Sequence, residues 1–291
     1  MYLFFDVGAT NTRFGYSNDG KKISSLAISK TARYFDDFVA DLDSFLKKNE
    51  KKNPEIIIGG CPGNIDEVNK VIKISRNLPN WVGKPVGEIL SREFKAKVIL
   101  KNDSALAGLG EAVYGAGRGF NIVAYLTIST GVGGARIVNS RIDKNTYGFE
   151  PGYQIIDIDG SVDARFLSRK ESYGNSYGYL QRLISGKDLF EKFGDLPENI
   201  KEKKIWNEII KYLSAGVINT IVYWSPEVVV IGGGLTKSNF FDLGKVINNL
   251  EEMNKIFLKL PEIKKSELGD FAGLYGALHL IKSLKIDKKG L

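Results

Sequence analysis

The sequence predicts an α/β fold, with enough length for one large or two medium domains. Short apolar runs that end in glycine-rich turns alternate with segments of helical period along the 291 residues. A strand–turn–strand pattern also occurs twice, at residues 2–20 and 122–142. Hydrophobic residues make up 43% and charged residues 26% of the chain, which is the composition of an ordinary globular enzyme with a buried core.

The first strand–turn–strand unit starts with the apolar run of residues 2–8, and a second hairpin turn is expected at Asp19 and Gly20. The elements expected after it are a helix, a buried strand, a short strand and a second helix at residues 38–46, 55–60, 98–100 and 105–113. Asp103 or Ser104 is expected to cap the second of these helices, because both residues lie between the short strand and the start of the helix.

The second strand–turn–strand unit is followed by further alternating elements. These are a long buried helix at residues 205–224, a strand at 227–231 that ends in three glycines, and a last helix at 271–281. The last helix carries small residues on one face, and close packing against another element is the simplest use for them.

No low-complexity linker separates the two halves, so the domain boundary has to be inferred from the repeated unit. We place it near residue 115, in a glycine-rich stretch that can act as a hinge. The predicted division is a small lobe at residues 1–114, a large lobe at 115–272 and a C-terminal helix at 273–291.

Composition excludes several classes of protein. No apolar run approaches the roughly 20 residues that a membrane-spanning helix needs, and the first residues lack the basic start of a secretory signal. We therefore expect a cytoplasmic protein with no membrane partner. The single cysteine, Cys61, and the single histidine, His279, leave no intramolecular disulfide and no cluster of soft ligands for zinc.

The net charge of +7 permits binding to anions, but the lysines are spread in short runs such as residues 51–52 and 203–204. There is no basic stripe interleaved with aromatic residues and no recognisable nucleic-acid motif. Solvated helix faces account for these charges better than nucleic acid as the main ligand.

Four segments place glycine with hydroxyl or carboxylate residues at the ends of predicted strands, where open α/β sheets bind ligands. The first is DVGATNTR at residues 6–13. Its glycine lets backbone N–H groups approach an anion, Thr10, Asn11 and Thr12 offer further donors, and Asp6 can hold a hydrated magnesium ion. An ordinary turn between two strands remains the alternative interpretation.

The second segment, TISTGVGGA at residues 127–135, again combines backbone donors with the hydroxyls of Ser129 and Thr130. It is neither a Walker P-loop nor a dinucleotide fingerprint, and a simple hairpin turn is the alternative. The third is the glycine run at residues 232–234, where a flat ring or a ribose could lie against exposed backbone. Alone it is more typical of a strand-to-helix turn.

The fourth segment is the pair Asn102 and Asp103 at the end of the short strand. A carboxylate at this place can accept the proton of an attacking alcohol if it lies within hydrogen-bond reach. For an isolated pair of this kind, helix capping would be the better interpretation. A catalytic role for Asp103 is favoured only because the other three segments occur in the same chain.

Taken together and in this order, the segments resemble the ROK family (repressors, open reading frames, kinases). The resemblance runs through nearly the whole chain and rests on residues 6–13, 60–63, 76–81, 102–111 with 114–117, 128–135 and 229–234. It implies an actin-like ATPase (ribonuclease H-like) fold with two lobes around a central cleft, and a C-terminal helix that packs back on the small lobe.

The resemblance also implies an ATP-dependent hexose kinase that is similar to glucokinases, acts on the 6-hydroxyl and uses Asp103 as the general base. The implied ATP site consists of Asp6, Gly8, Thr10, Asn11, Thr12, Thr130, Gly131, Gly133, Gly134, Gly232, Gly233 and Gly234, with Mg²⁺ held by Asp6, directly or through water. The implied sugar contacts are Gly63, Asn77, Asn102, Asp103, Glu150, Tyr153 and Glu171.

The chain departs from the family pattern around the sugar. Tyr153 stands where many members have a histidine that contacts the sugar and binds zinc, and the stretch at residues 161–171 has no cysteine or histidine. We therefore expect no zinc, and the departure bears on substrate identity more than on phosphoryl transfer. Tyr153 either donates a hydrogen bond to the sugar or packs, and Glu171 is either a sugar ligand or a glutamate on a helix surface.

Several alternatives follow from these departures. A kinase for fructose or for an N-acylated amino sugar, and a degenerate protein that binds sugar or nucleotide without turnover, both fit the same segments. A DNA-binding regulator of the family is disfavoured, since Asp6 lies almost at the first residue and leaves no room for a helix-turn-helix before it. The expected partners are a hexose and ATP, with a homodimer expected by family analogy. Cys61 and His279 are expected to serve packing.

Overall fold

The computed structural model describes residues 1–159 and 178–287. Contacts divide the chain into two compact units. The first unit comprises Met1–Gly115, Lys144–Gly148 and Asp270–Leu291, and the second comprises Ala116–Asp143 and Phe149–Gly269. The lobe boundaries predicted from the sequence, at residues 114 and 272, remain a prediction.

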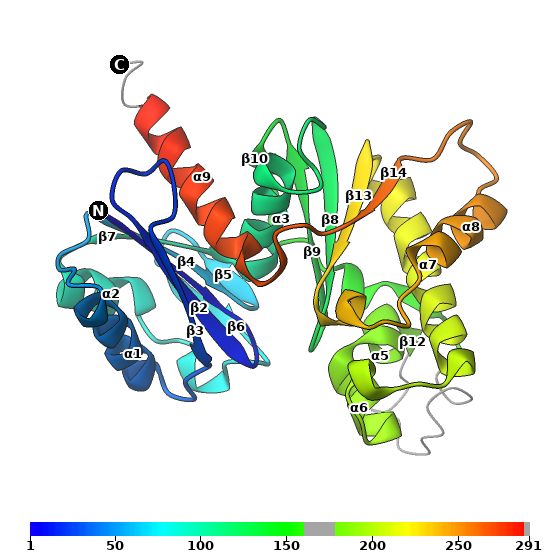
Figure 1. Cartoon of the computed structure of the whole chain (residues 1–291), viewed down its shortest axis with the longest axis horizontal. Helices are drawn as coiled ribbons and strands as arrows, with labels where there is room; N and C mark the ends of the chain where they lie inside the picture. Colours follow the sequence, from blue (N-terminus) through cyan, green and yellow to red (C-terminus); the bar gives the residue numbers. More distant parts are fainter. Residues whose placement is uncertain (160–177, 288–291) are drawn as a thin grey trace. The chain divides into compact units, whose positions relative to one another are not determined.

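The first unit is built on a five-stranded sheet with the order β3-β2-β1-β4-β7, whose strands appear in blue and cyan in Figure 1. The strands are β1 (Tyr2–Val7), β2 (Asn11–Ser17), β3 (Ser25–Lys30), β4 (Ile56–Cys61) and β7 (Lys97–Asn102). β1, β2 and β3 pair as antiparallel hairpins, whereas β1, β4 and β7 are parallel neighbours. The carboxyl ends of the three parallel strands therefore meet at one edge of the sheet.

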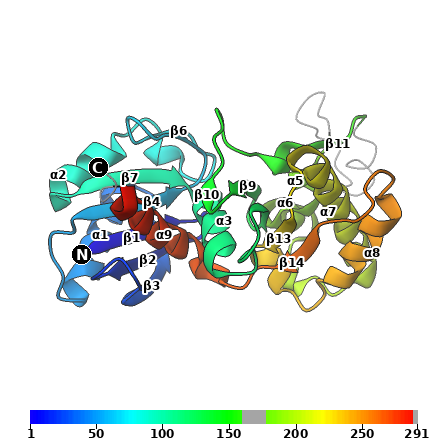
Figure 2. The same cartoon turned by 90° about the horizontal axis from the view of Figure 1, so that it is seen from above.

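Alternation along β1 explains why helices cover both faces of this sheet. Leu3, Phe5 and Val7 belong to a core formed with the helices α1 (Phe35–Lys48) and α2 (Val86–Phe94). Tyr2 and Phe4 belong to a second core formed with α3 (Asp103–Tyr114) and α9 (Ala272–Asp287). Because successive side chains of a strand point to opposite faces, an uninterrupted apolar run is what a strand covered on both sides requires. Figure 2 shows these helices around the strands from a second direction.

Three short elements lie in the segment after β4. The strands β5 (Asn64–Asp66) and β6 (Val71–Ile74) form an antiparallel pair, and the short 3-10 helix η1 (Pro79–Trp81) follows them. Trp81 is fully buried and its ring centroid lies 5.1 Å from that of Phe35 and 4.8 Å from that of Phe38. This aromatic cluster fixes the segment at residues 75–81 against α1.

The expected close packing of the last helix is present between α9 and α3. A Cβ added to Gly276 would lie 1.9 Å from the carbonyl oxygen of Leu106, and one added to Gly110 would lie 2.1 Å from that of Ala272. Both distances are far below van der Waals contact, so the two helix backbones can approach this closely only through glycine.

We expect Gly276→Ala to lower the free energy of unfolding by about 1–3 kcal/mol or more, since the added methyl group meets main chain that cannot move aside as a side chain would. Urea unfolding of the variant measures the effect. Ser283→Ala is the control on the same helix, because the Ser283 hydroxyl donates to the carbonyl of His279 in the preceding turn and to no other acceptor among the described residues. Equal stability of Gly276→Ala and wild type would contradict the close contact.

The second unit repeats the arrangement of the first. Its sheet has the order β10-β9-β8-β13-β14, formed by β8 (Ile122–Ile128), β9 (Val132–Val138), β10 (Arg141–Ile142), β13 (Val228–Gly232) and β14 (Glu262–Lys265). β8 and β9 form an antiparallel hairpin, and β8 is parallel to β13 as β1 is to β4. The strand–turn–strand unit seen twice in the sequence is thus the start of each sheet.

Helices and short elements cover the second sheet. They are α5 (Leu180–Ile184), α6 (Gly186–Phe193), α7 (Lys203–Trp224), α8 (Leu243–Met253), the pair β11 (Ile155–Asp157) and β12 (Gly178–Tyr179), and the 3-10 helices η2 (Pro151–Tyr153), η3 (Pro197–Asn199) and η4 (Gly234–Lys237). A further 3-10 helix, η5 (Gly269–Phe271), precedes α9. Val217 of α7 packs with Leu126 of β8 and Val229 of β13 in one core. Within residues 1–159 and 178–287, no helix combines the length and the apolar character that a membrane crossing needs.

Candidate active site

The first predicted phosphate loop is the tip of the β1–β2 hairpin. The N–H of Gly8 donates to the carbonyl of Asn11 at 3.0 Å, and Thr31 holds the tip from outside, its hydroxyl donating to the carbonyl of Gly8 at 2.7 Å. Among the described residues, the backbone N–H groups of Ala9 and Thr10 donate to no acceptor. A braced turn with free N–H groups is suited to binding an anion.

Asp6 lies at the base of the same hairpin, opposite Arg13 in the strand register. A Cβ on Gly273 would lie 2.6 Å from its Oδ2 and a Cβ on Gly60 would lie 3.0 Å from its Oδ1, so glycines on two other elements make room for this carboxyl group. Burial raises the pKa of Asp6 to about 7; Asp103 also raises it, while the charge of Arg13 lowers it.

Arg13 connects the hairpin to the start of α9. Its Nη1 donates to the carbonyl of Asn11 at 3.0 Å, and its Nη2 pairs with Oδ1 of Asp270 at 3.3 Å. Its Nε is buried without a hydrogen-bond partner among the described residues. Arg13 belongs to the first predicted motif but had no predicted role, and Asp270, which is 257 positions away, was not predicted.

Asp103 is the first residue of α3, at the carboxyl end of β7. Burial raises the pKa of Asp103 above its usual range, against hydrogen bonds from Ser104 and the charge of Arg13, which lower it. The N–H of Ser104 donates to its Oδ1 at 2.8 Å. Asp103 therefore lies close enough to Asp6 to raise the pKa of Asp6, at the edge where β1 and β7 end.

The expected cap by Asp103 or Ser104 is wrong: Asn102 is the N-cap of α3. Its backbone is extended and its Oδ1 accepts from the N–H of Ala105 at 3.1 Å, which is the geometry of a capping residue. Its Nδ2 also donates to the carbonyl of Gly63 at 3.1 Å. The cap is one residue earlier than expected, so the Asp103 carboxylate does not serve it.

We expect Asn102→Ala to lower the free energy of unfolding by about 1–2 kcal/mol, because it removes the cap and leaves the Gly63 carbonyl without its donor. Asn102→Ser restores a capping hydroxyl but not the donor, and it should recover part of the loss. Urea unfolding of the three proteins gives the comparison. If the serine variant were no more stable than the alanine variant, capping would not be the source of the effect.

Gly63 and Asn77 lie on the loop that follows β4. Gly63 has φ +104°, and a Cβ there would lie 2.0 Å from the carbonyl oxygen of Ile74, so no other residue fits. Asn64, the next residue, pairs with Ile74 across β5 and β6. This pairing brings the segment that carries Asn77 back beside Gly63. The carbonyl of Gly63 accepts the hydrogen bond from Asn102 described above.

The second predicted phosphate loop is the turn between β8 and β9 in the second unit. The N–H of Ser129 donates to the carbonyl of Gly131 at 2.8 Å, and the N-terminus of α6 holds the turn, with the N–H of Gly186 donating to the carbonyl of Ser129 at 2.7 Å. Among the described residues, the N–H groups of Thr130 and Gly131 donate to no acceptor. Like the first hairpin tip, this turn therefore has two adjacent backbone N–H groups that are available to an anion.

Glycines fill the places where this turn meets its neighbours. A Cβ on Gly134 would lie 2.7 Å from Cγ of Pro151, and one on Gly233, which has φ +92°, would lie 2.2 Å from the carbonyl oxygen of Ile128. Gly232 pairs with Thr127 across the parallel strands β13 and β8. The glycine run after β13 therefore lies directly beside the β8–β9 turn within the second unit. Gly133 lies in β9 itself.

The remaining predicted sugar contacts are Glu150, Tyr153 and Glu171. Glu150 is exposed and immediately precedes η2, and the ring of Tyr153 in η2 packs edge to face against Tyr179 at 5.7 Å. Packing of Tyr153 is thus observed, which was one of its two expected roles. Glu171 and the stretch at residues 161–171 lie outside the described residues.

Cys61 and His279 serve packing as expected. Cys61 is a free, fully buried thiol in β4, and burial together with the carboxylates of Asp103 and Asp6 raises its pKa far above the usual range. The ring of His279 packs edge-on against Tyr114 at 6.3 Å. Neither residue has the environment of a nucleophile or its base.

Each sheet thus begins with a hairpin whose tip has free N–H groups, followed by parallel strands, and this repeated unit defines the actin-like ATPase fold expected from the sequence. The chain belongs to the ROK family, whose model matches residues 2–284. Both the fold and the family predicted from the sequence are therefore confirmed.

Individual relatives agree with this assignment over nearly their full lengths. Glucokinase of Thermotoga maritima is 25% identical, with 95% of this chain and 96% of the relative covered. N-acetyl-D-glucosamine kinase of Pectobacterium atrosepticum is 28% identical, with 97% and 99% covered. Among solved structures, ROK hexokinase from Thermus thermophilus has a TM-score of 0.76 at 23% identity, with 95% of this chain and 96% of that chain covered.

A ROK family glucokinase from Streptomyces griseus, solved with glucose and AMPPNP, also has a TM-score of 0.76, at 19% identity, with 96% of this chain and 98% of that chain covered. At such identities the structural likeness shows the fold alone. The two curated relatives described above are sugar kinases that are named for different sugars.

Proposed function

We propose that this protein is an ATP-dependent sugar kinase that transfers the γ-phosphoryl group to a hexose hydroxyl, with Asp103 as the general base. The proposal rests on the position and the environment of Asp103. Its carboxylate lies at the carboxyl edge of the first sheet, its pKa is raised toward the range of a working base, and Asn102 leaves it free of the capping role.

In the proposed reaction, the hydroxyl oxygen of the sugar attacks the γ-phosphorus and its proton passes to a carboxylate oxygen of Asp103. The bond between the γ-phosphorus and the β,γ-bridging oxygen breaks, and ADP leaves. Such a transfer needs little covalent chemistry from the protein, so positioning and charge stabilisation supply most of the rate. The free N–H groups of Ala9, Thr10, Thr130 and Gly131 are the proposed donors to the phosphates.

The residues present fit a magnesium ion, which is the proposed cofactor with ATP. Asp6 and Asp103 place two carboxylates near each other in a setting that disfavours both charges, and a divalent cation would neutralise them. Mg²⁺ is commonly held by only one or two carboxylates, with water and phosphate oxygens completing its shell. Asp6 is the proposed ligand, and the bound ion would neutralise charge on the transferred phosphoryl group.

For the acceptor, glucose at its 6-hydroxyl is the first candidate, with Gly63, Asn77, Asn102 and Glu150 as proposed contacts in addition to Asp103. Relatives named as N-acetyl-D-glucosamine kinases make N-acylated amino sugars the second candidate, and fructose is a third. The proposed adenosine contacts are the glycines at residues 232–234, since they lie beside the β8–β9 turn.

Release of ADP from MgATP in the presence of glucose, fructose, mannose, N-acetylglucosamine and N-acetylmannosamine tests the proposal. We expect turnover that depends on at least one of these sugars and is lost in Asp103→Asn. Binding of a sugar without turnover would support the degenerate alternative instead. Absence of both binding and turnover with every sugar would overturn the proposed function.

A further inference from the structure

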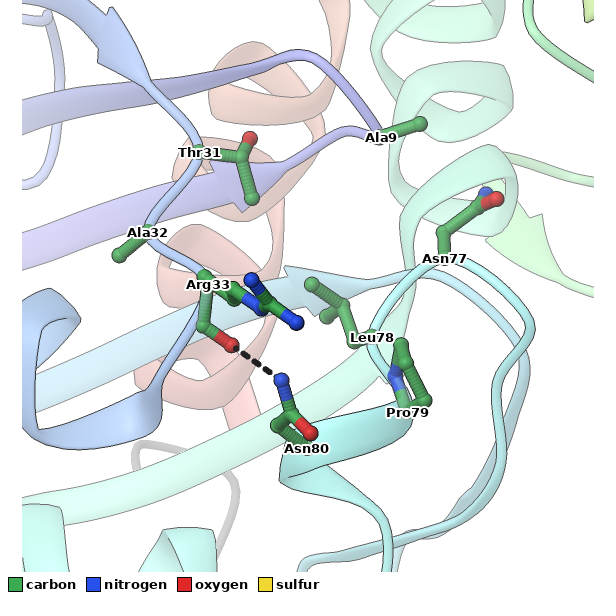
Figure 3. Close-up of a pocket in the computed structure, with 8 residues that line it drawn as sticks. All are labelled: Ala9, Thr31, Ala32, Arg33, Asn77, Leu78, Pro79 and Asn80. Atoms are coloured by element: carbon green, nitrogen blue, oxygen red, sulfur yellow. Dashed lines mark hydrogen bonds between the residues drawn. The ribbon is translucent and has the colours of Figure 1, made fainter.

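A pocket in the first unit lies next to the proposed sugar and phosphate contacts, and two of those contacts, Asn77 and Ala9, are part of its lining. It has a volume of about 310 Å³ and is formed between the loop after β3 and the segment that follows β6 (Figure 3). Thr31 and Arg33 come from one wall, and Asn77, Leu78 and Asn80 come from the other. The volume is near the lower end of the ~300–1,000 Å³ typical of small-molecule sites, so one substituent or one ring fits.

The wall with Arg33 carries a positive charge, and Arg33 itself is exposed. Arg33 forms no ion pair with any of the described residues, and its guanidinium lies over the ring of Tyr34 at 5.7 Å. In the part of the chain that the structure describes, no aspartate or glutamate lines the pocket. Figure 3 shows the Arg33 side chain reaching from its loop toward Leu78 on the opposite wall. A free arginine with no carboxylate in the lining is complementary to an oxyanion.

The two asparagines give the pocket further polar character, and one of them bridges its two walls. The Nδ2 of Asn80 donates to the backbone carbonyl of Arg33 at 3.4 Å and so connects the two walls. The amide of Asn77 lines the same space and can donate to an oxygen. Buried Leu78 supplies the apolar part of the wall between them.

The pocket is continuous with the proposed reaction site through two of its residues. Ala9 is part of the first hairpin tip, and the hydroxyl of Thr31 donates to the carbonyl of Gly8 in that tip. Asn77 is itself a proposed sugar contact. A substituent that a sugar bound at Asn77 extends into this pocket would face the wall that carries Arg33.

We propose that this pocket is a subsite for an oxyanion substituent, a carboxylate or a phosphate, carried by the acceptor sugar, with Arg33 as its specificity-determining residue. This inference rests on the proposed kinase function and narrows its substrate class from hexoses in general to hexoses that carry an acidic group. A neutral sugar leaves the charge of Arg33 facing water.

Matched pairs of acceptors test the subsite. N-acetylmuramic acid differs from N-acetylglucosamine by a lactyl group with a carboxylate, and glucose 1-phosphate differs from glucose by a phosphate. The kcat/KM of each is measured with MgATP for wild type, Arg33→Met, Arg33→Lys and Arg92→Met. The last variant removes an exposed arginine of α2 and is the control for overall charge.

We expect wild type to use at least one of the two acids. The ratio of kcat/KM for that acid to kcat/KM for its neutral partner should fall roughly tenfold or more in Arg33→Met, as expected for loss of a charge-assisted hydrogen bond. Arg33→Lys should retain part of the ratio, and Arg92→Met should leave it unchanged. The pair that responds distinguishes a carboxylate from a phosphate ligand.

Equal losses for acid and neutral sugar in Arg33→Met would overturn the subsite, as would failure of wild type to bind either acid. Titration calorimetry with the same four sugars, on wild type and Arg33→Met without nucleotide, separates this from failure of the kinase proposal. If no sugar is phosphorylated but an acid still binds and loses affinity in Arg33→Met, the subsite stands while the proposed reaction does not.

Discussion

Asp103→Asn is expected to lower kcat for sugar phosphorylation by roughly 10²–10⁴-fold, which is the usual contribution of a positioned general base. The amide cannot accept the proton of the attacking hydroxyl. Its oxygen can still accept from the N–H of Ser104, as Oδ1 of Asp103 does at 2.8 Å. The rate should therefore fall while the local structure at the start of α3 is kept.

Stability distinguishes this chemical effect from a folding defect. Burial disfavours the charge on Asp103, so the neutral amide should leave the free energy of unfolding unchanged or raise it. Asp36→Asn, which removes an exposed carboxylate from the first turn of α1, is the matched control and should retain full activity. A variant at position 103 that kept more than a tenth of the wild-type kcat would show that another group takes the proton.

The second large effect expected concerns Asp6 and pH. The pKa of Asp6 is about 7 in the folded protein, against an ordinary value of 3.8 for an aspartate, so between these two pH values the folded chain holds a proton that the unfolded chain has lost. The stability of the metal-free protein should fall as pH rises through this window, by up to about 1.4 kcal/mol per pH unit from this group alone. Above pH 7 the loss from Asp6 should level off.

Urea unfolding at a series of pH values from 4 to 8, with a chelator present, measures this slope. Other carboxyl groups titrate in the same range, so the informative quantity is the difference between wild type and Asp6→Asn. That difference should grow in favour of the variant up to about pH 7, because the amide never acquires the buried charge. Parallel curves for the two proteins would show that Asp6 titrates normally.

The strands and helices that carry motifs could be predicted from the sequence, and the reason is physical. An apolar run such as residues 2–7 followed by a glycine turn can satisfy its backbone and bury its side chains in few ways other than a hairpin strand. The helix α8 and the edge strand β14 were not predicted. β14 consists of Glu262, Ile263, Lys264 and Lys265, and its polar composition is typical of an edge strand and equally of a loop.

The residues of the candidate site could be predicted from the sequence, but the hydrogen bonds and ion pairs between them could not. Strand ends show where Asp6 and Asp103 lie, since parallel strands end at one edge. Which residue caps α3 is decided by backbone conformation, which the residue types Asn, Asp and Ser do not settle. The pair of Arg13 with Asp270 depends on how α9 returns to β2, and no local pattern carries that information.

The return of α9 also sets the order in which the molecule can be made. Gly273 fits against the carboxyl group of Asp6, so the surroundings of a residue at the start of the chain are completed by a segment translated near its end. A nascent chain that has emerged only as far as residue 115 has every strand of its first sheet but leaves Tyr2 and Phe4 without their α9 partners. Ribosome-bound intermediates should therefore expose this apolar face until residues 272–287 have emerged, and during that interval they are natural clients for chaperones.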